Sequence, residues 1–158
     1  MASMFLLVGI FGCNKPAEAD EEKSVDSIAK TVAADAAQHT AQIDKVIVYY
    51  FHNTRRCATC LGIQRVIEET IDTGFTKDIE AGMLEFRELN MEEEPNKKYV
   101  QQFQLSFGTM VVAAEANGET RKWENAGKVW ELAQSPDELK AYVEKNIRQQ
   151  LDLIGRRI

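Results

Sequence analysis

The feature that most constrains the fold is a C-x-x-C motif between a predicted strand and a predicted helix. Residues 46–51 form an unbroken run of β-branched and aromatic side chains, and apolar residues recur every three or four positions from Ile63 to Ile71. Cys57 and Cys60 lie where that helix would begin. A cysteine in the first turn of a helix lies near unpaired N–H groups and the positive end of the helix dipole, and both stabilise a thiolate. The motif therefore predicts a thiol–disulfide site.

The same stretch assigns candidate roles to five residues. Cys57, at the exposed start of the helix, is the predicted nucleophile, and Cys60, one turn further in, is the predicted resolving thiol. Arg55 and Arg56 immediately precede Cys57 and would stabilise its thiolate. His52 is the nearest titratable candidate for proton transfer. The alternative interpretation is a loop histidine bonded to the backbone and two solvated arginines.

Composition narrows the class of protein. The 158 residues are 44% apolar and 28% charged, which suits a single folded domain with a packed core. The net charge of −6, without a basic stripe carrying interleaved aromatics, argues against nucleic acid as a partner.

The odd third cysteine has its own context. The apolar run before Cys13 is too short for a bilayer, which needs ~20 apolar residues, and has the length of the apolar part of a signal peptide. Residues 10–13, Ile-Phe-Gly-Cys, resemble a bacterial lipobox. This predicts a signal peptide over residues 1–12, lipidation of Cys13, and a lipid-anchored protein of the bacterial cell envelope on its periplasmic or extracytoplasmic face. The alternative is a packed or disordered apolar N-terminus with a free cysteine.

The chain after Cys13 is expected to be a tether followed by a domain. Residues 13–44 are alanine-rich and acidic, with seven acidic residues against three lysines and hence a net charge of −4. Weak helical periodicity over residues 27–37 indicates that the tether is partly helical. The folded domain is predicted to span residues 45–153, and residues 154–158 to form a tail.

Within the domain the predicted order of elements is βαβαββα. Strands are expected over 45–51, 83–90, 109–114 and 119–123, with Asn117-Gly118 as the turn between the last two. The final helix is expected to begin at Pro136, with Ser135 as its N-cap. This order predicts an α/β sheet whose first strands are parallel, with helices on both faces.

That order, with C-x-x-C after the first strand, resembles the thioredoxin fold over residues 45–152. Leu89-Asn90 followed by Pro95 and Tyr99 is similar to the segment after the third thioredoxin strand, and residues 127–142 are similar to the C-terminal segment. The resemblance implies a thioredoxin-like fold, with a central mixed sheet of about four strands flanked by helices, and an N-terminal tether. It also implies that residues Phe107, Gly108 and Thr109 form the loop facing the dithiol.

The sequence departs from thioredoxins in that loop. Gly108 stands where thioredoxins have a cis-proline, and the prolines of this chain lie elsewhere, at Pro16, Pro95 and Pro136. Since a cis bond before a residue other than proline costs ~2.5–4 kcal/mol, a trans loop is expected. The first strand also lacks the buried carboxylate that would accept the proton of the resolving thiol.

A narrower resemblance concerns the motif itself. Tyr50-Phe51-His52 together with Arg56–Cys60 is similar to the ArsF family of nitrophenyl-compound nitroreductase subunits. This resemblance implies an accessory subunit of a reductase. No flavin or phosphate-binding signature appears in the sequence, so another subunit would have to hold such a cofactor. No cofactor is expected here beyond a redox-active Cys57–Cys60 disulfide.

The predicted function is thiol–disulfide exchange or two-electron transfer with a redox partner protein or a thiol substrate. Three alternatives stay open. The first is binding of Cu(I) or As(III) by the thiolates of Cys57 and Cys60, with His52 as a third ligand at best. The second is a non-catalytic accessory subunit. The third is a static structural disulfide, although a loop of this size constrains the unfolded chain little.

Overall fold

The computed structural model describes residues 42–156, which belong to the second of the two units of the chain, residues 37–158. The predicted signal peptide, the lipidation of Cys13 and nearly all of the tether lie outside the described residues. Among residues 42–156 no helix is both long enough and apolar enough to span a membrane.

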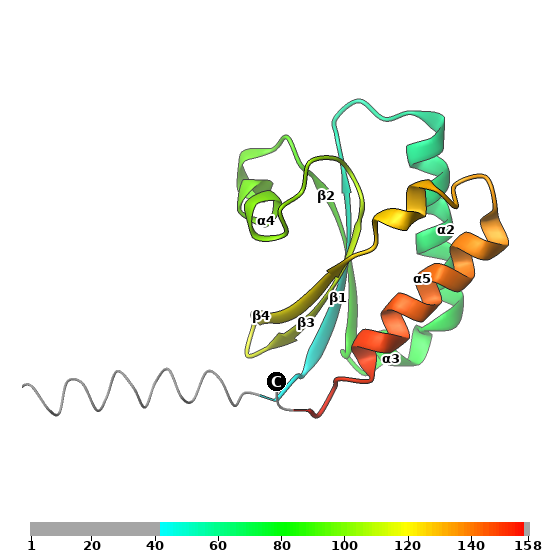
Figure 1. Ribbon diagram of the computed structural model, residues 1–158. Coiled ribbons are helices and arrows are strands. Elements are labelled where there is room, and N and C mark those ends of the chain that lie inside the picture. Colours follow the sequence, from blue (N-terminus) through cyan, green and yellow to red (C-terminus); the bar gives the residue numbers. More distant parts are fainter. Residues whose placement is uncertain (1–41, 157–158) are drawn as a thin grey trace, which may run out of the picture. The chain divides into compact units, whose positions relative to one another are not determined.

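The order of the main elements is the predicted one, and two short 3-10 turns and a short helix lie between them (Figure 1). The strands are β1 (Lys45–His52), β2 (Leu84–Asn90), β3 (Met110–Ala116) and β4 (Glu119–Asn125). The helices are α2 (Ala58–Gly74), α3 (Thr76–Glu80), α4 (Lys97–Gln102) and α5 (Pro136–Leu151), and the 3-10 turns are η1 (Glu94–Asn96) and η2 (Gly127–Trp130).

The four strands form one mixed sheet in the order β2-β1-β3-β4. β1 pairs in parallel with β2 and antiparallel with β3, and β3 continues into β4 as an antiparallel hairpin. The hairpin turns at Asn117 and Gly118, whose φ angles of 56° and 78° are those that a tight two-residue turn requires. The predicted thioredoxin-like fold is confirmed by this topology.

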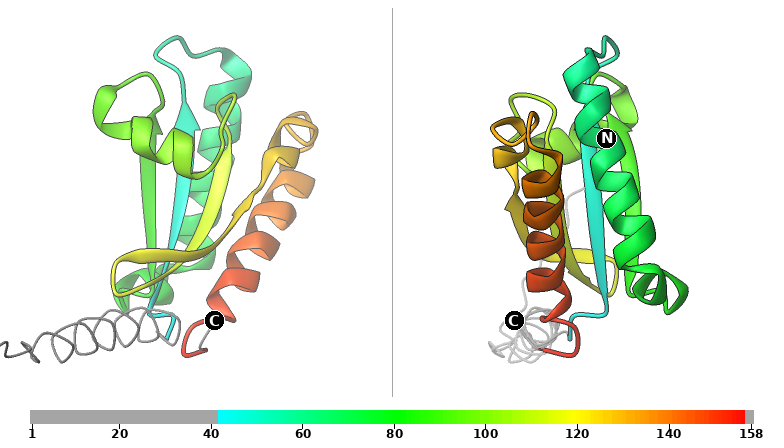
Figure 2. Two further views of the ribbon diagram at one scale, coloured as in Figure 1. Left: turned by 60° about the vertical axis from the view of Figure 1, so that its left-hand side comes forward. Right: turned by 90° about the vertical axis from the view of Figure 1, so that its right-hand side faces the viewer.

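Helices α2 and α5 cover one face of the sheet and α4 covers part of the other (Figures 1 and 2). β1 is a central strand of the sheet, with helices on both of its faces, and every residue from Val46 to Phe51 is buried. This explains why its sequence is continuously apolar rather than alternating. The even-numbered residues of β1 pack against Ile63 and Ile67 of α2 and Val143 of α5.

The opposite face carries an aromatic cluster. Tyr49 and Phe51 of β1 pack against Phe103, which follows α4, with ring centroids 5.4 and 5.9 Å apart. Trp123 of β4 meets Phe103 edge-on at 5.4 Å. These contacts hold α4 over the half of the sheet nearest the end of β1.

The two ends of the described chain pair with each other just before β1 begins. Ile43 is buried, its N–H donates to the carbonyl of Arg156 (2.9 Å), and its own carbonyl accepts from the N–H of Gly155 (2.9 Å). The packed domain therefore reaches a few residues beyond both predicted boundaries, 45 and 153. At the start of α5, Pro136 occupies the first turn as predicted, but the Ser135 side chain makes no capping hydrogen bond.

Gly108 lies where two backbone segments approach each other. A Cβ atom at this position would stand 2.6 Å from the carbonyl oxygen of Phe51 and 3.2 Å from the Cα of His52. The neighbouring Thr109 carbonyl accepts a hydrogen bond from the N–H of Phe51 (2.8 Å), which fixes this approach. The peptide bonds within residues 42–156 are all trans, as predicted for this loop. Glycine is needed here because of contact with β1.

We predict that Gly108→Ala lowers the free energy of unfolding by roughly 1–3 kcal/mol, because the added methyl group overlaps a backbone carbonyl that cannot move freely. Gly62→Ala is the matched control, since a Cβ there meets no atom within 4 Å and the residue lies inside α2. The control should gain roughly 0.5–1 kcal/mol. Urea denaturation of both variants checks this, and equal stability of the two would refute the close approach.

Candidate dithiol site

The two cysteines lie at the junction between the loop that follows β1 and the start of α2. Cys57 is the N-cap residue of α2, with extended backbone angles (φ −92°, ψ 167°), and its Sγ accepts a hydrogen bond from the N–H of Cys60 (3.3 Å). The side chain of Cys57 thus takes the place of the serine or aspartate oxygen that usually caps a helix. This contact holds the sulfur against the unpaired N–H groups of the first turn.

The environments of the two thiols shift their pKa values in opposite directions. Their Sγ atoms are 2.8 Å apart; Cys57 is exposed, and Cys60 is half-buried. Hydrogen bonds from the Cys60 thiol and from backbone N–H groups of the first turn lower the pKa of Cys57. Burial, followed by the hydrogen bond to Cys57, raises the pKa of Cys60. An exposed, more acidic thiol beside a shielded, less acidic one is what the predicted division into nucleophile and resolving thiol requires.

Arg56 contacts other residues than the cysteines. Its Nη1 donates to Oε1 of Glu88 (2.7 Å), its Nη2 donates to Gln64, and its guanidinium lies over the ring of Tyr50, 5.8 Å from the centroid. Within residues 42–156 no hydrogen bond joins Arg56 to either sulfur, and the exposed Arg55 side chain has no hydrogen-bond or ion-pair partner. The pKa of Cys57 is lowered first by the hydrogen bond with the Cys60 thiol and then by backbone N–H groups of the first turn, so thiolate stabilisation by the two arginines stays a prediction.

The contacts of His52 are likewise with groups other than the sulfurs. Its Nδ1 donates to the carbonyl of Asn53 (3.0 Å), and its Nε2 lies 3.1 Å from Oε1 of Glu88. A role in proton transfer therefore stays a prediction that no direct contact supports. No three His, Cys, Asp or Glu side chains in the described part of the chain gather in a way that could hold a metal ion. His52 does not join the two thiols as a third ligand.

Two site residues, Tyr50 and Glu88, are absent from the sequence-based prediction. The hydroxyl of Tyr50 donates to the carbonyl of Cys60 (2.8 Å), and burial raises the pKa of Tyr50 to about 12, so this group acts as a donor. Glu88 lies opposite Tyr50 in the β1–β2 register. The sequence shows a glutamate in a strand, but not which residue of β1 it will face.

The loop of residues 107–109 lies against the end of β1, where Gly108 approaches Phe51 and His52, and its facing of the dithiol stays a prediction. The carbonyl of Gly108 accepts a hydrogen bond from Nε1 of Trp130 (2.7 Å), and Thr109 is buried. Phe107 is 56% exposed and meets the ring of Trp130 edge-on at 6.5 Å. Leu61, the residue after Cys60, is 48% exposed. Large apolar side chains are therefore open to solvent both beside Cys60 and on this loop.

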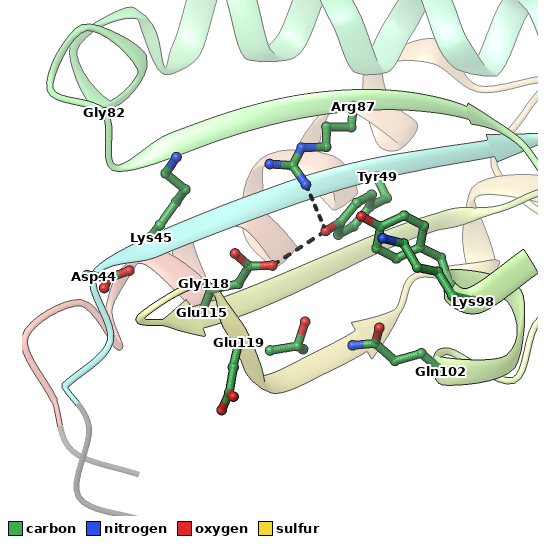
Figure 3. A pocket seen from close by; sticks show the side chains of 12 residues that line it. Asp44, Lys45, Tyr49, Gly82, Arg87, Lys98, Gln102, Glu115, Gly118 and Glu119 are labelled. Atoms are coloured by element: carbon green, nitrogen blue, oxygen red, sulfur yellow. Dashed lines mark hydrogen bonds between the residues drawn. The ribbon is translucent and has the colours of Figure 1, made fainter. Parts of the chain in front are cut away.

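A polar pocket of about 960 Å³ lies at the other end of β1, beside Lys45 (Figure 3). In it the hydroxyl of Tyr49 stands between Arg87 and Glu115, 3.5 Å from a side-chain atom of each. Arg87 Nε donates to Glu85 (2.5 Å). Glu115 is buried, and burial raises its pKa. Several charges of the pocket thus pair with one another, and for Glu115 the effect of burial outweighs its contacts with Arg87 and Tyr49.

Comparison with known proteins finds structural likeness only. No family model matches the chain, and no curated protein matches it. Among solved structures, the thioredoxin of Malassezia sympodialis (Mala s 13) is 19% identical, with a TM-score of 0.41 over 72% of this chain and 84% of that chain. A thioredoxin from Thermus thermophilus is 14% identical (TM-score 0.40, 77% and 85% coverage). A disulphide isomerase from Xylella fastidiosa Temecula1 is 15% identical (TM-score 0.41, 82% and 96%).

At these identities and TM-scores the likenesses say nothing of activity. The chain has a thioredoxin-like fold. That statement rests on its own strand order, on its helices on both faces, and on the position of C-x-x-C after β1. No comparison supports the narrower ArsF resemblance.

We predict that Glu115→Gln stabilises the domain at pH 8, on the order of 1 kcal/mol or a few degrees in Tm. A carboxyl whose pKa is raised by folding stabilises the fold fully below its unfolded pKa, and loses that contribution as the pH rises through its folded pKa. The gain should therefore disappear near pH 4. Glu69→Gln, an exposed carboxylate on α2, is the control and should show little change. Thermal unfolding across this pH range tests it; a loss of Tm at pH 8 would contradict it.

Proposed function

We propose that this protein carries out thiol–disulfide exchange, or two-electron transfer, through Cys57 and Cys60. The observation that carries the proposal is the pair of thiols 2.8 Å apart at a helix N-terminus, one exposed with a lowered pKa and the other shielded with a raised pKa. A bridge needed only for stability would not require this asymmetry, and closing so small a loop contributes little to stability.

The exchange would proceed in two displacements. The Cys57 thiolate attacks one sulfur of a substrate disulfide, so that a Cys57–substrate disulfide forms and the other substrate sulfur leaves as a thiolate and takes a proton from water. The Cys60 thiol then loses its proton to solvent and attacks Sγ of Cys57. The Cys57–Cys60 disulfide forms as the mixed disulfide breaks. The second substrate sulfur leaves as a thiolate and takes a proton from water, so the substrate departs as a dithiol. Two electrons pass from the protein dithiol to the substrate disulfide, and the reverse sequence oxidises a substrate dithiol.

Exposed apolar side chains support a protein as the partner. Phe107 and Leu61 are two of the three exposed large apolar residues in the described part of the chain, and Leu61 adjoins Cys60. Such side chains favour contact with a partner surface over contact with a small polar thiol.

We propose further that the domain is anchored to the outside of a bacterial membrane through a lipid on Cys13. The motif that supports this is the apolar run ending in Ile-Phe-Gly-Cys. Mass spectrometry of the protein from its native host tests the anchor, because an intact Met1 with unmodified Cys13 would exclude it.

A narrower proposal, also supported by a sequence motif, is that the protein is an accessory subunit of a nitro-compound reductase, as the ArsF-like motif suggests.

We predict that Cys60→Ser accumulates a mixed disulfide with the redox partner, whereas Cys57→Ser forms none. Without Cys60, the Cys57–substrate disulfide has no neighbouring thiol to resolve it, and without Cys57 the exposed nucleophile is missing. Exchange activity should fall below detection in both variants. Ala58→Ser, which places a hydroxyl between the two cysteines and keeps both thiols, is the matched control and should exchange normally. Non-reducing gels after acid quenching of whole cells measure the trapped complex; equal trapping by both variants would contradict the assignment.

A further inference from the structure

One carboxylate, that of Glu88, contacts polar side chains on both sides of the loop that carries Cys57. Glu88 of β2 stands opposite Tyr50 of β1, on the face of the sheet that α2 covers. Its Oε1 accepts from Nη1 of Arg56 at 2.7 Å and lies 3.1 Å from Nε2 of His52. His52 is the last residue of β1, and Arg56 directly precedes Cys57. Glu88 therefore ties both ends of the loop that carries Cys57 to the neighbouring strand.

Arg56 is held on three sides. Glu88 binds it from β2, Gln64 binds it from α2, and its guanidinium lies over the ring of Tyr50. Only 19% of its side chain is exposed, and its buried Nε–H has no partner among the described residues. The hydroxyl of Tyr50 in turn donates to the carbonyl of Cys60. A continuous set of contacts thus runs from Glu88 through Arg56 and Tyr50 to the second cysteine.

We propose that Glu88 is a positioning residue that holds Arg56 between β2 and α2, so that the guanidinium charge is balanced by the carboxylate rather than presented to the Cys57 thiolate. The network thereby sets the reduction potential of the Cys57–Cys60 pair. This inference rests on the proposed exchange function for its biological meaning, although the contacts themselves do not depend on it.

The expected direction follows from charge. With Glu88 in place, the guanidinium beside Cys57 has a partner of opposite sign within 3 Å, and its field at the sulfur is weakened. Without that carboxylate, Arg56 keeps Gln64 and Tyr50 as neighbours, but its charge is no longer compensated and stabilises the thiolate. A stabilised thiolate favours the reduced protein, so the pair becomes a stronger oxidant.

The test compares Glu88→Gln with Glu92→Gln in the full-length protein. Glu92 follows the same strand and is exposed; it accepts the backbone N–H of Thr54 at 3.1 Å and binds no guanidinium. Each variant loses one negative charge near the loop that carries Cys57. The equilibrium constant of the dithiol with glutathione and the alkylation rate of Cys57 at pH 7 are measured for both, after circular dichroism has shown that they fold.

We expect Glu88→Gln to favour the reduced state of the pair by about three- to tenfold, which is up to about 30 mV. The alkylation rate of Cys57 should rise as well. Glu92→Gln should have at most a small effect. When Arg56→Gln is added, the Glu88→Gln effect should shrink to that of the control, because the two residues act as a pair. Equal effects of the two glutamate variants, or an effect that persists without Arg56, would overturn the proposal.

These outcomes are separate from those that test the exchange function. If the wild-type protein forms no mixed disulfide with any partner, the exchange function fails, yet the glutathione equilibrium and the alkylation rate of the variants still report whether Glu88 governs Arg56. If exchange occurs but the Glu88 and Glu92 variants behave alike, only the positioning role fails.

Discussion

The rest of the site depends on the hydrogen bond between the N–H of Cys60 and the sulfur of Cys57. It makes the nucleophile its own helix cap, and so places the sulfur where unpaired N–H groups of α2 converge. The strand before it is buried on both faces and the helix after it packs into the core through Ile63 and Ile67. Neither end of the loop can shift without cost, and the spacing of the two thiols follows from that rigidity.

The surroundings of the thiols are arranged by a second constraint, the close approach of other segments to the end of β1. On one side Gly108 comes so near the Phe51 carbonyl that a side chain is excluded, and the Trp130 indole fixes the carbonyl of Gly108. On the other side Glu88 collects His52 and Arg56. The loop with the exposed Phe107 ring thus lies on one side of the end of β1, and the contacts of Glu88 with Arg56 and His52 lie on the other.

Much of this could be predicted from sequence, because the signals were local. The apolar run of β1, the Asn117-Gly118 turn and the cysteine spacing each act within a few residues. The placement of Arg56 and His52 could not, since their partner Glu88 is some thirty residues away and reaches them only through the β1–β2 register. The sequence shows that Gly108 replaces a proline. The reason for glycine at this position, its close approach to Phe51, is a tertiary contact that the sequence does not show.

The most direct test of a redox-active pair is an equilibrium titration of Cys57 and Cys60 against glutathione or dithiothreitol buffers in metal-free solution, with the oxidised fraction read by alkylation and mass spectrometry. The asymmetric thiols predict reversible exchange at a potential well above about −300 mV, where structural disulfides typically lie. A pair that stays oxidised far below that potential would show a structural bridge instead and would contradict the exchange function.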